Sequence, residues 1–435
     1  MADHIDAYLA WQEAAGRTPA TVDESSPFEG AGDADRAAVG AAVDDLRPEL
    51  EALAVALHDD PETGFDEHRS VRRIADLLAA HGVEAEVGAF GLDTALRATV
   101  GEGDGPHFAV IAEYDALPGI GQACGHNIIA GIGVGAFLAA APLVARRGGR
   151  LSLIGTPAEE NGGGKEHIIR AGGFDDVDAA GMVHPAGGDE VSSIVGQRTT
   201  GVRRVAVTYR GRAAHAAGAP WLGLNALDAV VTAYQGVAQL RQHILPIDRV
   251  HGIITDGGAA PNIVPERASA LFYVRSGEVD TLRALTDRVV AVLEGAAVST
   301  GATAEIEVDP VPPYLPLEAN VALTKRWAAT IRSRGRAVPA PPLVPAQGGP
   351  STDMGNVSRY VPSIHPSIGL GAPAGVQPHN AAFADATVRP AAFAAMADAA
   401  AALGAAAIDY LADARLRDAV SEEFAALGGR FRWEG

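Results

Sequence analysis

The stretch HFAVIAEYDALPGIGQACGHN, residues 107–127, decides the fold of this chain. It opens with an apolar run bounded by turn residues, which predicts a buried strand that ends in a loop. Polar side chains follow the strand at Asp115, Cys124 and His126. Open α/β sheets bind their ligands at the edge formed by the C-terminal ends of the strands. The stretch therefore predicts one strand of such a sheet and part of a site at its edge.

Two later stretches repeat the pattern of a buried strand followed by polar residues. They are RLSLIGTPAEENGGG (150–164), which carries Glu159 and Glu160, and AAGMVHPAGG (179–188), which carries His184. Helical stretches are interleaved with these strands, and the last of them is an alanine-rich segment near the C-terminus. This order predicts an α/β fold in which helices cover both faces of a mixed sheet.

The pattern changes near residue 196, where VRRVAVTYRG alternates with period two, as a half-buried strand does. The elements expected after it are a helix over 224–244, strands over 249–258 and 267–276, a helix over about 279–299 and a strand over 303–309. The order βαββαβ makes a two-layer domain of about 110 residues. We therefore predict one domain in two parts, residues 1–197 and 315–435, and an inserted domain over 198–314.

Length, composition and charge exclude several classes of protein. The chain has 435 residues, of which 48% are hydrophobic and 20% are charged, so it can bury a sizeable core. Single cores stop growing at roughly 250–300 residues, which agrees with more than one domain. The net charge of -20 and the lack of a lysine or arginine run make nucleic acid a poor partner.

Cysteine content and the first residues predict a cytoplasmic protein. A single cysteine forms no intramolecular disulfide, and MADHIDAYLAWQ lacks the basic and apolar pattern of a signal peptide. A short amphipathic helix is expected over residues 6–15. Residues 128–145 are uncharged and barely long enough to span a bilayer, but glycine, proline and alanine make them weakly hydrophobic. We expect a buried helix there and no membrane segment.

The polar residues after the strands form a donor set suited to a metal ion. Singly, Cys124 is typical of a small buried apolar residue, and the glutamate pair is typical of a solvated helix start. Together, a thiolate, imidazoles and a carboxylate are the donors that zinc-like divalent ions accept. Gly125 lets the backbone turn tightly between Cys124 and His126. One glutamate can then bind metal while its neighbour takes a proton from metal-bound water.

Several motifs of the chain, taken together, resemble the aminoacylase and glutamate-carboxypeptidase-like zinc amidohydrolases, which hold two metal ions. The motifs are EYDALPGIGQACGHN, GTPAEENGGGKEHII, AAHAAGAPWLGLNALDA, VHGIITDGGAAPNIVP and STDMGNVS. The likeness extends from about Ala54 to Asp385 and is strongest to the branch of aminobenzoyl-glutamate hydrolase, indole-acetyl-amino-acid hydrolases and β-alanyl-lysine dipeptidase. It implies that the inserted domain is a ferredoxin-like lid through which two copies form a homodimer.

The resemblance also implies roles for individual residues. The implied ligands of two zinc or manganese ions are Cys124, His126, Glu160, His184 and His379. Glu159 would be the catalytic base, and Asp115 would orient a ligand. Many relatives have a metal-binding histidine where this chain has Glu113, so the thiol and His126 would replace that ligand. His365 competes with His379 as the fifth ligand.

Three residues of the inserted domain match substrate-contacting positions of the family. His215 matches a histidine that, in dimeric relatives, reaches the partner's site and stabilises the oxyanion. Asn262 and Arg275 match positions that hold the substrate carboxylate or carbonyl. From the residues alone, Arg275 could equally be a solvated strand end, and Asn262 could fix a turn before Ile-Val-Pro.

The function expected from these observations is metal-dependent hydrolysis of an amide bond in an N-acyl amino acid or small dipeptide with a free carboxylate. Relatives differ in whether the leaving amino acid is basic or acidic, and the sequence leaves this open. A cysteine-nucleophile amidase, with Cys124 activated by His126, is one alternative. A peptide-binding relative without catalytic activity is the other.

Overall fold

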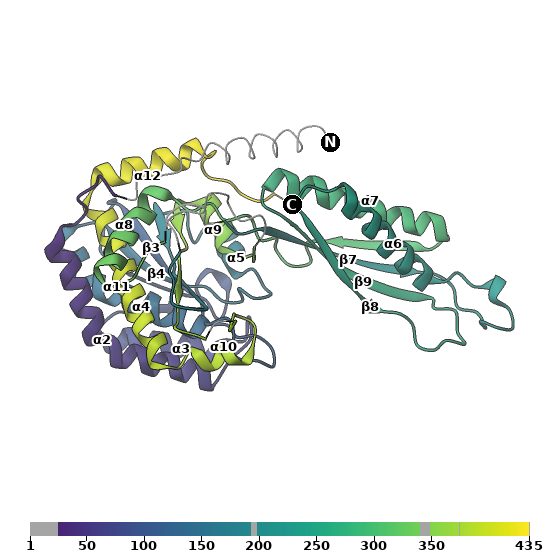
Figure 1. Ribbon diagram of the computed structural model, residues 1–435, viewed down its shortest axis with the longest axis horizontal. Helices are drawn as coiled ribbons and strands as arrows, with labels where there is room; N and C mark the ends of the chain where they lie inside the picture. The colour runs from purple at the N-terminus through teal and green to yellow at the C-terminus, as the bar shows by residue number, and fades with distance from the viewer. Residues whose placement is uncertain (1–24, 193–197, 340–348, 374, 435) are drawn as a thin grey trace.

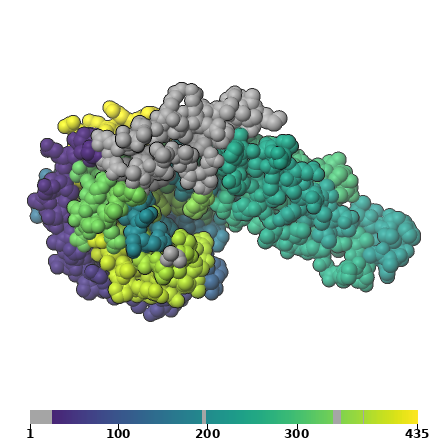
Figure 2. Space-filling model, viewed as in Figure 1, coloured from purple at the N-terminus to yellow at the C-terminus, as the bar shows by residue number. Residues whose placement is uncertain are grey.

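The computed structural model describes residues 25–192, 198–339, 349–373 and 375–434, and the helix expected over 6–15 lies outside them. The chain forms a rounded body and an elongated lobe, residues 201–308, that projects from it (Figures 1 and 2). Each part contains a sheet with its own helices. The predicted α/β class, a helix-flanked mixed sheet, is confirmed.

The sheet of the body is built around the strand that opens the 107–127 stretch. Among the described residues, six strands form it in the order β1-β2-β4-β3-β5-β11. They are β1 (Ala85–Val87), β2 (Leu96–Val100), β3 (His107–Ala112), β4 (Arg150–Gly155), β5 (Ala179–Gly181) and β11 (Ser363–Ile364). The strands β3, β4, β5 and β11 run parallel, while β1 and β2 are antiparallel to their neighbours. The ends of the four parallel strands therefore meet at one edge.

Every residue of β3 is buried because helices cover both faces of the sheet. Phe108 and Val110 pack on one side and Ala109 and Ile111 on the other, as the two-residue period of a strand requires. The first face is covered by α2 (Asp33–Asp59), α4 (His126–Arg147), α8 (Val321–Ser333) and α11 (Pro390–Ala412), and the second by α5 (Gly164–Arg170) and α9 (Met354–Tyr360). The other α-helices described in the body are α3 (His68–Ala80), α10 (Ala381–Ala386) and α12 (Ala414–Ala426).

One predicted strand is divided in the structure. The segment 179–188 contains β5, which pairs with β3 in the main sheet, and then β6 (His184–Ala186). The strand β6 pairs instead with β12 (Ser367–Gly369) in a separate two-stranded sheet. Both halves of the segment pair with the same later part of the chain, β5 with β11 in the main sheet and β6 with β12 in the separate sheet. The division carries His184 beyond the edge of the main sheet.

Two helices in the described part of the chain, α4 and α11, are long and apolar enough to cross a membrane. The protein buries 83% of the most apolar window of α4 and 78% of that of α11. A helix that faced lipid would expose this surface, whereas α4 and α11 pack against each other and against the sheet. Their composition is that of core helices.

The lobe has the predicted βαββαβ order and a hydrophobic core of its own. Its elements are β7 (Gly201–Arg210), α6 (Ala226–Leu240), β8 (Arg249–Asp256), β9 (Arg267–Ser276), α7 (Val279–Thr300) and β10 (Thr303–Val308). The strands are antiparallel in the order β10-β7-β9-β8. The helix α6 is shorter than predicted because Asn225 caps its start, accepting the N–H of Leu227 at 2.9 Å.

The lobe joins the body through two adjacent segments. Val202, at the start of the lobe, exchanges backbone hydrogen bonds of 2.8 and 3.0 Å with Tyr314, where the chain returns. Figure 1 shows β7 running from the body into the lobe, where it pairs with β9 and β10. The boundaries 198 and 314 of the inserted domain remain a prediction.

Close packing of α4 on β3 predicts a stability difference between two glycine positions. A Cβ at Gly133 would lie 2.9 Å from Cβ of Ala112 and 3.1 Å from the carbonyl oxygen of Ile111. Overpacking of this kind costs about 1–3 kcal/mol, which exceeds the gain of about 1 kcal/mol in helix propensity. We expect Gly133→Ala to lower the melting temperature.

The matched control is Gly295→Ala in α7, where an added Cβ meets nothing within 4 Å. Only the propensity gain applies there, so the melting temperature should stay level or rise. Thermal unfolding of the two variants compares them directly. A melting temperature of Gly133→Ala equal to or above that of Gly295→Ala would contradict the packing argument.

Candidate metal centre and substrate cavity

Polar side chains from four separate segments converge at the C-terminal edge of the main sheet. Glu113 and Asp115 follow β3, Cys124 precedes α4 and His126 is its first residue. The other members are Glu159 and Glu160 after β4, His184 at the start of β6 and His379 before α10. Apart from Asp115, these residues belong to groups of three in which the ligand atoms all lie within 4.8 Å of one another.

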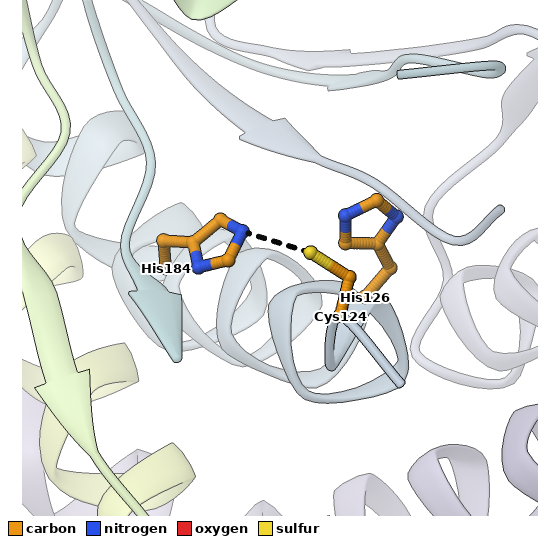
Figure 3. Close-up of side chains that lie close together, drawn as sticks. All are labelled: Cys124, His126 and His184. Carbon is orange, nitrogen blue, oxygen red and sulfur yellow. Dashed lines mark hydrogen bonds between the residues drawn. The ribbon is translucent and has the colours of Figure 1, made fainter. Parts of the chain in front are cut away.

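Cys124, His126 and His184 form the first group (Figure 3). Sγ of Cys124 lies 3.6 Å from Nε2 of His184, and the two imidazole rings stand nearly perpendicular at 88°. Gly125 adopts a φ of 84°, and a Cβ there would lie 2.6 Å from Cγ of Pro185. Only glycine fits between the two donors, as expected for the tight turn of this motif.

A second group joins His126 to the two glutamates. Nε2 of His126 lies 3.8 Å from Oε2 of Glu159, 3.9 Å from Oε1 of Glu160 and 3.6 Å from Oε2 of Glu113. Among the described residues, Nε2 of His126, Oε1 of Glu160 and Oε2 of Glu113 are buried and have no hydrogen-bond partner. Buried polar atoms are normally paired, so converging unpaired donors fit divalent cations.

Asp115 holds two of these donors in place. Its Oδ1 lies 2.8 Å from Nδ1 of His126, and its Oδ2 accepts the backbone N–H of Glu160 at 3.0 Å. A proton on Nδ1 of His126 leaves the Nε2 lone pair free for a metal ion. The structure thus places Asp115 where it orients two candidate ligands.

Several buried acids lie close together in the cluster, with too little positive charge nearby to balance them. Burial raises the pKa of Glu159 well above its usual value, and the carboxylates of Glu113 and Glu160 add to the effect. Burial also raises the pKa of the Cys124 thiol and lowers that of His184 to about 3, with the neighbouring His365 contributing. A divalent cation would oppose the shifts of Glu159 and Cys124, because it favours the carboxylate and the thiolate, and it would reinforce the neutral imidazole of His184.

The two candidates for the fifth ligand occupy different positions. Nε2 of His379 lies 3.7 Å from Oε2 of Glu160, and His379 forms a group with Cys124 and Glu160. His379 adopts a φ of 68°, unusual for a non-glycine residue, and its N–H donates to the carbonyl of Ala123 at 2.7 Å. His365 stacks on His184 at 5.6 Å between ring centroids and belongs to none of the groups found among the described residues. The geometry places His379 nearer to the other donors.

Sequence reasoning missed a buried ion triad behind the cluster. Lys165 donates from Nζ to Oε1 of Glu113 and, at 2.7 Å, to Oδ1 of Asp353, and all three side chains are fully buried. Lysine is almost never fully buried unless it is paired. The triad fixes Glu113 so that its second oxygen faces His126. The charged residues were visible in the sequence, but nothing in it showed that three distant segments meet.

A cavity of about 870 Å³ opens beside the cluster, between the body and the lobe. Cys124, Glu159, Glu160, His184 and His379 lie on its wall. The lobe contributes Val202, Arg204, Tyr273 and Arg275. The volume is that of a site for a small molecule.

The three residues expected to contact substrate are not together. Arg275 lines the cavity, whereas His215 and Asn262 are exposed and lie outside its lining. His215 sits in a loop of the lobe, in a β-bridge with Ile263. Within one chain the structure therefore brings Arg275 to the cavity and leaves His215 and Asn262 away from it.

Comparisons with known proteins agree with this geometry. The family model for peptidase family M20/M25/M40 matches residues 109–405. The Xaa-Arg dipeptidase of Mus musculus is 36% identical over 342 residues, which cover 76% of this chain and 78% of that protein. A p-aminobenzoyl-glutamate hydrolase polypeptide of Escherichia coli is 35% identical over 280 residues, which cover 59% of this chain and 57% of that protein.

A solved structure shows the same fold at lower sequence identity. A dinuclear metal-binding peptidase from Bacillus subtilis superimposes with a TM-score of 0.57 at 20% identity, covering 83% of this chain and 98% of that one. The chain thus combines the fold of a dinuclear metallopeptidase with a candidate metal-binding cluster. The resemblance inferred from the motifs is confirmed, and the chain belongs to peptidase family M20/M25/M40, a family of metal-dependent hydrolases.

Proposed function

We propose that this protein hydrolyses the amide bond of an N-acyl amino acid or small dipeptide that carries a free carboxylate. The observation that carries the proposal is the set of unpaired buried donors beside Glu159 on the wall of a small-molecule cavity. The names of two relatives, a dipeptidase and an aminobenzoyl-glutamate hydrolase, describe substrates of this kind.

Two divalent ions, when bound, lower the pKa of a water molecule and polarise the substrate carbonyl. Glu159 takes the proton of the attacking water and returns it to the leaving amine. Tyr314 supports this role, because its hydroxyl donates to the backbone carbonyl of Glu159 and accepts the N–H of Gly163 at 3.1 Å. Glu160, 3.7 Å from His379, is the glutamate assigned to metal binding.

The proposed ions are zinc or manganese, held by Cys124, His126, Glu160, His184 and His379. Sulfur and imidazole donors suit zinc, and carboxylates also suit manganese. We further propose a cytoplasmic location because a metal-binding Cys124 has to remain a reduced thiol.

The alternative of a cysteine nucleophile fits the geometry less well. Burial holds the Cys124 thiol in its protonated form by raising its pKa, and Nδ1 of His126 is engaged by Asp115. A binding protein without activity would not need Glu159 beside the donors. Neither alternative explains why Glu159 and Glu160 converge with the other candidate ligands.

We also propose that two copies associate through the lobe and that His215 completes the partner's site. The strand β8 is an edge strand whose Ile253 is 62% exposed, and Trp221 in the short 3₁₀ helix Pro220–Leu222 of the lobe is 76% exposed. Nδ1 of His215 accepts the N–H groups of Ala217 and Gly218 at 3.2 and 3.0 Å, so the ring proton lies on Nε2. An exposed N–H of this kind can donate to an oxyanion.

Replacing the proposed base separates catalysis from metal binding. We expect Glu159→Gln to lower kcat by about 100- to 10,000-fold, since it removes the proton acceptor, while metal content stays that of the unaltered protein. A panel of N-acyl amino acids and dipeptides measures turnover, and elemental analysis measures metal content.

The matched control is the neighbouring Glu160→Gln, for which metal content should fall together with activity. Chelation should abolish the activity of the unaltered protein, and zinc or manganese should restore it. Full turnover by Glu159→Gln would refute the assignment of the base. Activity that survives complete removal of metal would favour the cysteine-nucleophile alternative.

A role for His215 in the partner's site predicts complementation between two inactive variants. We expect His215→Ala and Glu159→Gln each to lose activity as homodimers. Random mixing makes half of the dimers heterodimers, and each heterodimer has one intact site out of two. About one quarter of full activity should therefore return. The assay is turnover after the two variants are mixed and their chains exchange.

An added Ile253→Asp substitution on both variants provides the control for the lobe interface. A charge in the middle of β8 should prevent association, which light scattering measures, and should abolish complementation. Complementation without dimers, or dimers in which mixing restores no activity, would argue against the role of His215 in trans.

A further inference from the structure

The cavity wall that the lobe provides is positively charged. Arg204 and Arg275 of the lobe line the cavity together with Arg198, which precedes the lobe in the chain, and the acids among the described lining residues are Glu159 and Glu160 of the body. Arg198 is already paired, with Glu278 at 2.9 Å and Glu318 at 3.4 Å. Within the described residues, Arg204 and Arg275 form no ion pair with a carboxylate. Two guanidinium groups on this wall are therefore available to an anion.

Arg204 is held rigidly with part of its hydrogen-bonding capacity unused. The residue is 5% exposed, and its guanidinium lies 5.3 Å from the ring centroid of Tyr273 and 4.9 Å from that of Tyr314. Its Nε donates to the Tyr273 hydroxyl at 3.3 Å, whereas Nη1 is buried without a hydrogen-bond partner. An unpaired buried guanidinium nitrogen is costly, and stacking fixes the plane in which a carboxylate can be bound.

Arg275 stands beside Arg204 on the same face of the lobe sheet. Arg204 on β7 is opposite Tyr273 on β9, and Val202 is opposite Arg275, so the two arginines are diagonal neighbours. Nη1 of Arg275 donates to Oγ of Ser351 at 2.7 Å, and Nε donates to His251 at 3.1 Å. Burial lowers the pKa of Arg275, and repulsion from Arg204 contributes. Neither of these neighbouring positive charges is paired with a carboxylate in the described part of the chain.

The pair lies one aromatic ring away from the proposed base. Tyr314 contacts the backbone carbonyl of Glu159 through its hydroxyl and the guanidinium of Arg204 through its ring. The leaving amino acid carries the free carboxylate of the substrate, so it is the half that suits the side of the cavity with the two arginines. One arginine suffices for the α-carboxylate, so the other remains for a second anion.

We infer that this cavity selects substrates whose leaving amino acid carries two carboxylates, as glutamate and aspartate do, with Arg204 and Arg275 as the residues that bind them. This inference rests on the proposed function, whose substrate class it narrows. A basic leaving group would place its side-chain cation against the guanidinium group that the α-carboxylate leaves unpaired, which like-charge repulsion disfavours.

Three substrates with one acyl group test the inference. N-benzoyl-glutamate, N-benzoyl-glutamine and N-benzoyl-lysine differ in the charge of the leaving group while their scissile bonds are alike. We expect kcat/KM for the glutamate compound to exceed that for the glutamine compound by at least about tenfold, the worth of a charge-assisted hydrogen bond, with the lysine compound lowest. A glutamine or lysine compound hydrolysed as well as the glutamate compound would overturn the inference.

Variants of the two arginines locate the second carboxylate. We expect Arg204→Gln or Arg275→Gln to bring the ratio of kcat/KM for the glutamate compound to that for the glutamine compound to within about twofold of unity. The reason is that one of the two substitutions removes the guanidinium group that binds the side-chain carboxylate. Arg204→Lys should retain part of the preference. The matched control is Arg198→Gln, in the same cavity but already neutralised, which should leave the ratio unchanged. A ratio unaffected in both glutamine variants would also overturn the inference.

A binding measurement distinguishes failure of the inference from failure of the proposed function. Free L-glutamate should raise the melting temperature of the metal-loaded protein more than L-glutamine does, whether or not the compounds are hydrolysed. If none of the N-acyl compounds or dipeptides is hydrolysed but glutamate binds preferentially, the proposed function fails and the anion site stands. If hydrolysis occurs without a preference for glutamate in either assay, the inference alone fails.

Discussion

The burial of several acids at one edge of a sheet is the constraint on which the rest of the structure depends. Four carboxylates, Glu113, Glu159, Glu160 and Asp353, lie close together there, and Lys165 is the fully buried cation among the described residues that contacts two of them. Their repulsion in a medium of low dielectric is tolerable only with added positive charge. Lys165 supplies it on one side of the cluster, and metal ions are suited to supply it on the other.

The fold follows from sequence patterns wherever local periodicity decides the structure. The apolar run of β3 and the alternating β7 are both found where the patterns predict them. The division of residues 179–188 could not be predicted because it depends on a partner elsewhere in the chain. Periodicity recognised 179–188 as extended chain, but the pairing of β6 with β12 arises from contacts with a distant segment.

The candidate site could also be predicted only in part, because short motifs reveal some of its residues whereas the packing of the folded chain determines the rest. Cys124, His126 and the glutamate pair are visible because short motifs place them after strands. The orientation of Arg204 was not visible, because the neighbouring Arg203 is chemically identical and alternation sends the two to opposite faces. Arg203 pairs with Asp309 at 2.7 Å and stacks on Trp433, while Arg204 faces the cavity. Sequence alone could not tell which arginine meets a ligand.

The place of the lobe within the chain has a consequence for how the protein is made. The lobe occupies residues 201–308, and β11, which completes the main sheet by pairing with β5, begins at residue 363. During synthesis the lobe therefore emerges and can fold as a unit while the main sheet still lacks its last strand. Asp353 and His379 also emerge after the lobe. The candidate metal cluster can consequently be completed only after the lobe has been synthesised, near the end of translation.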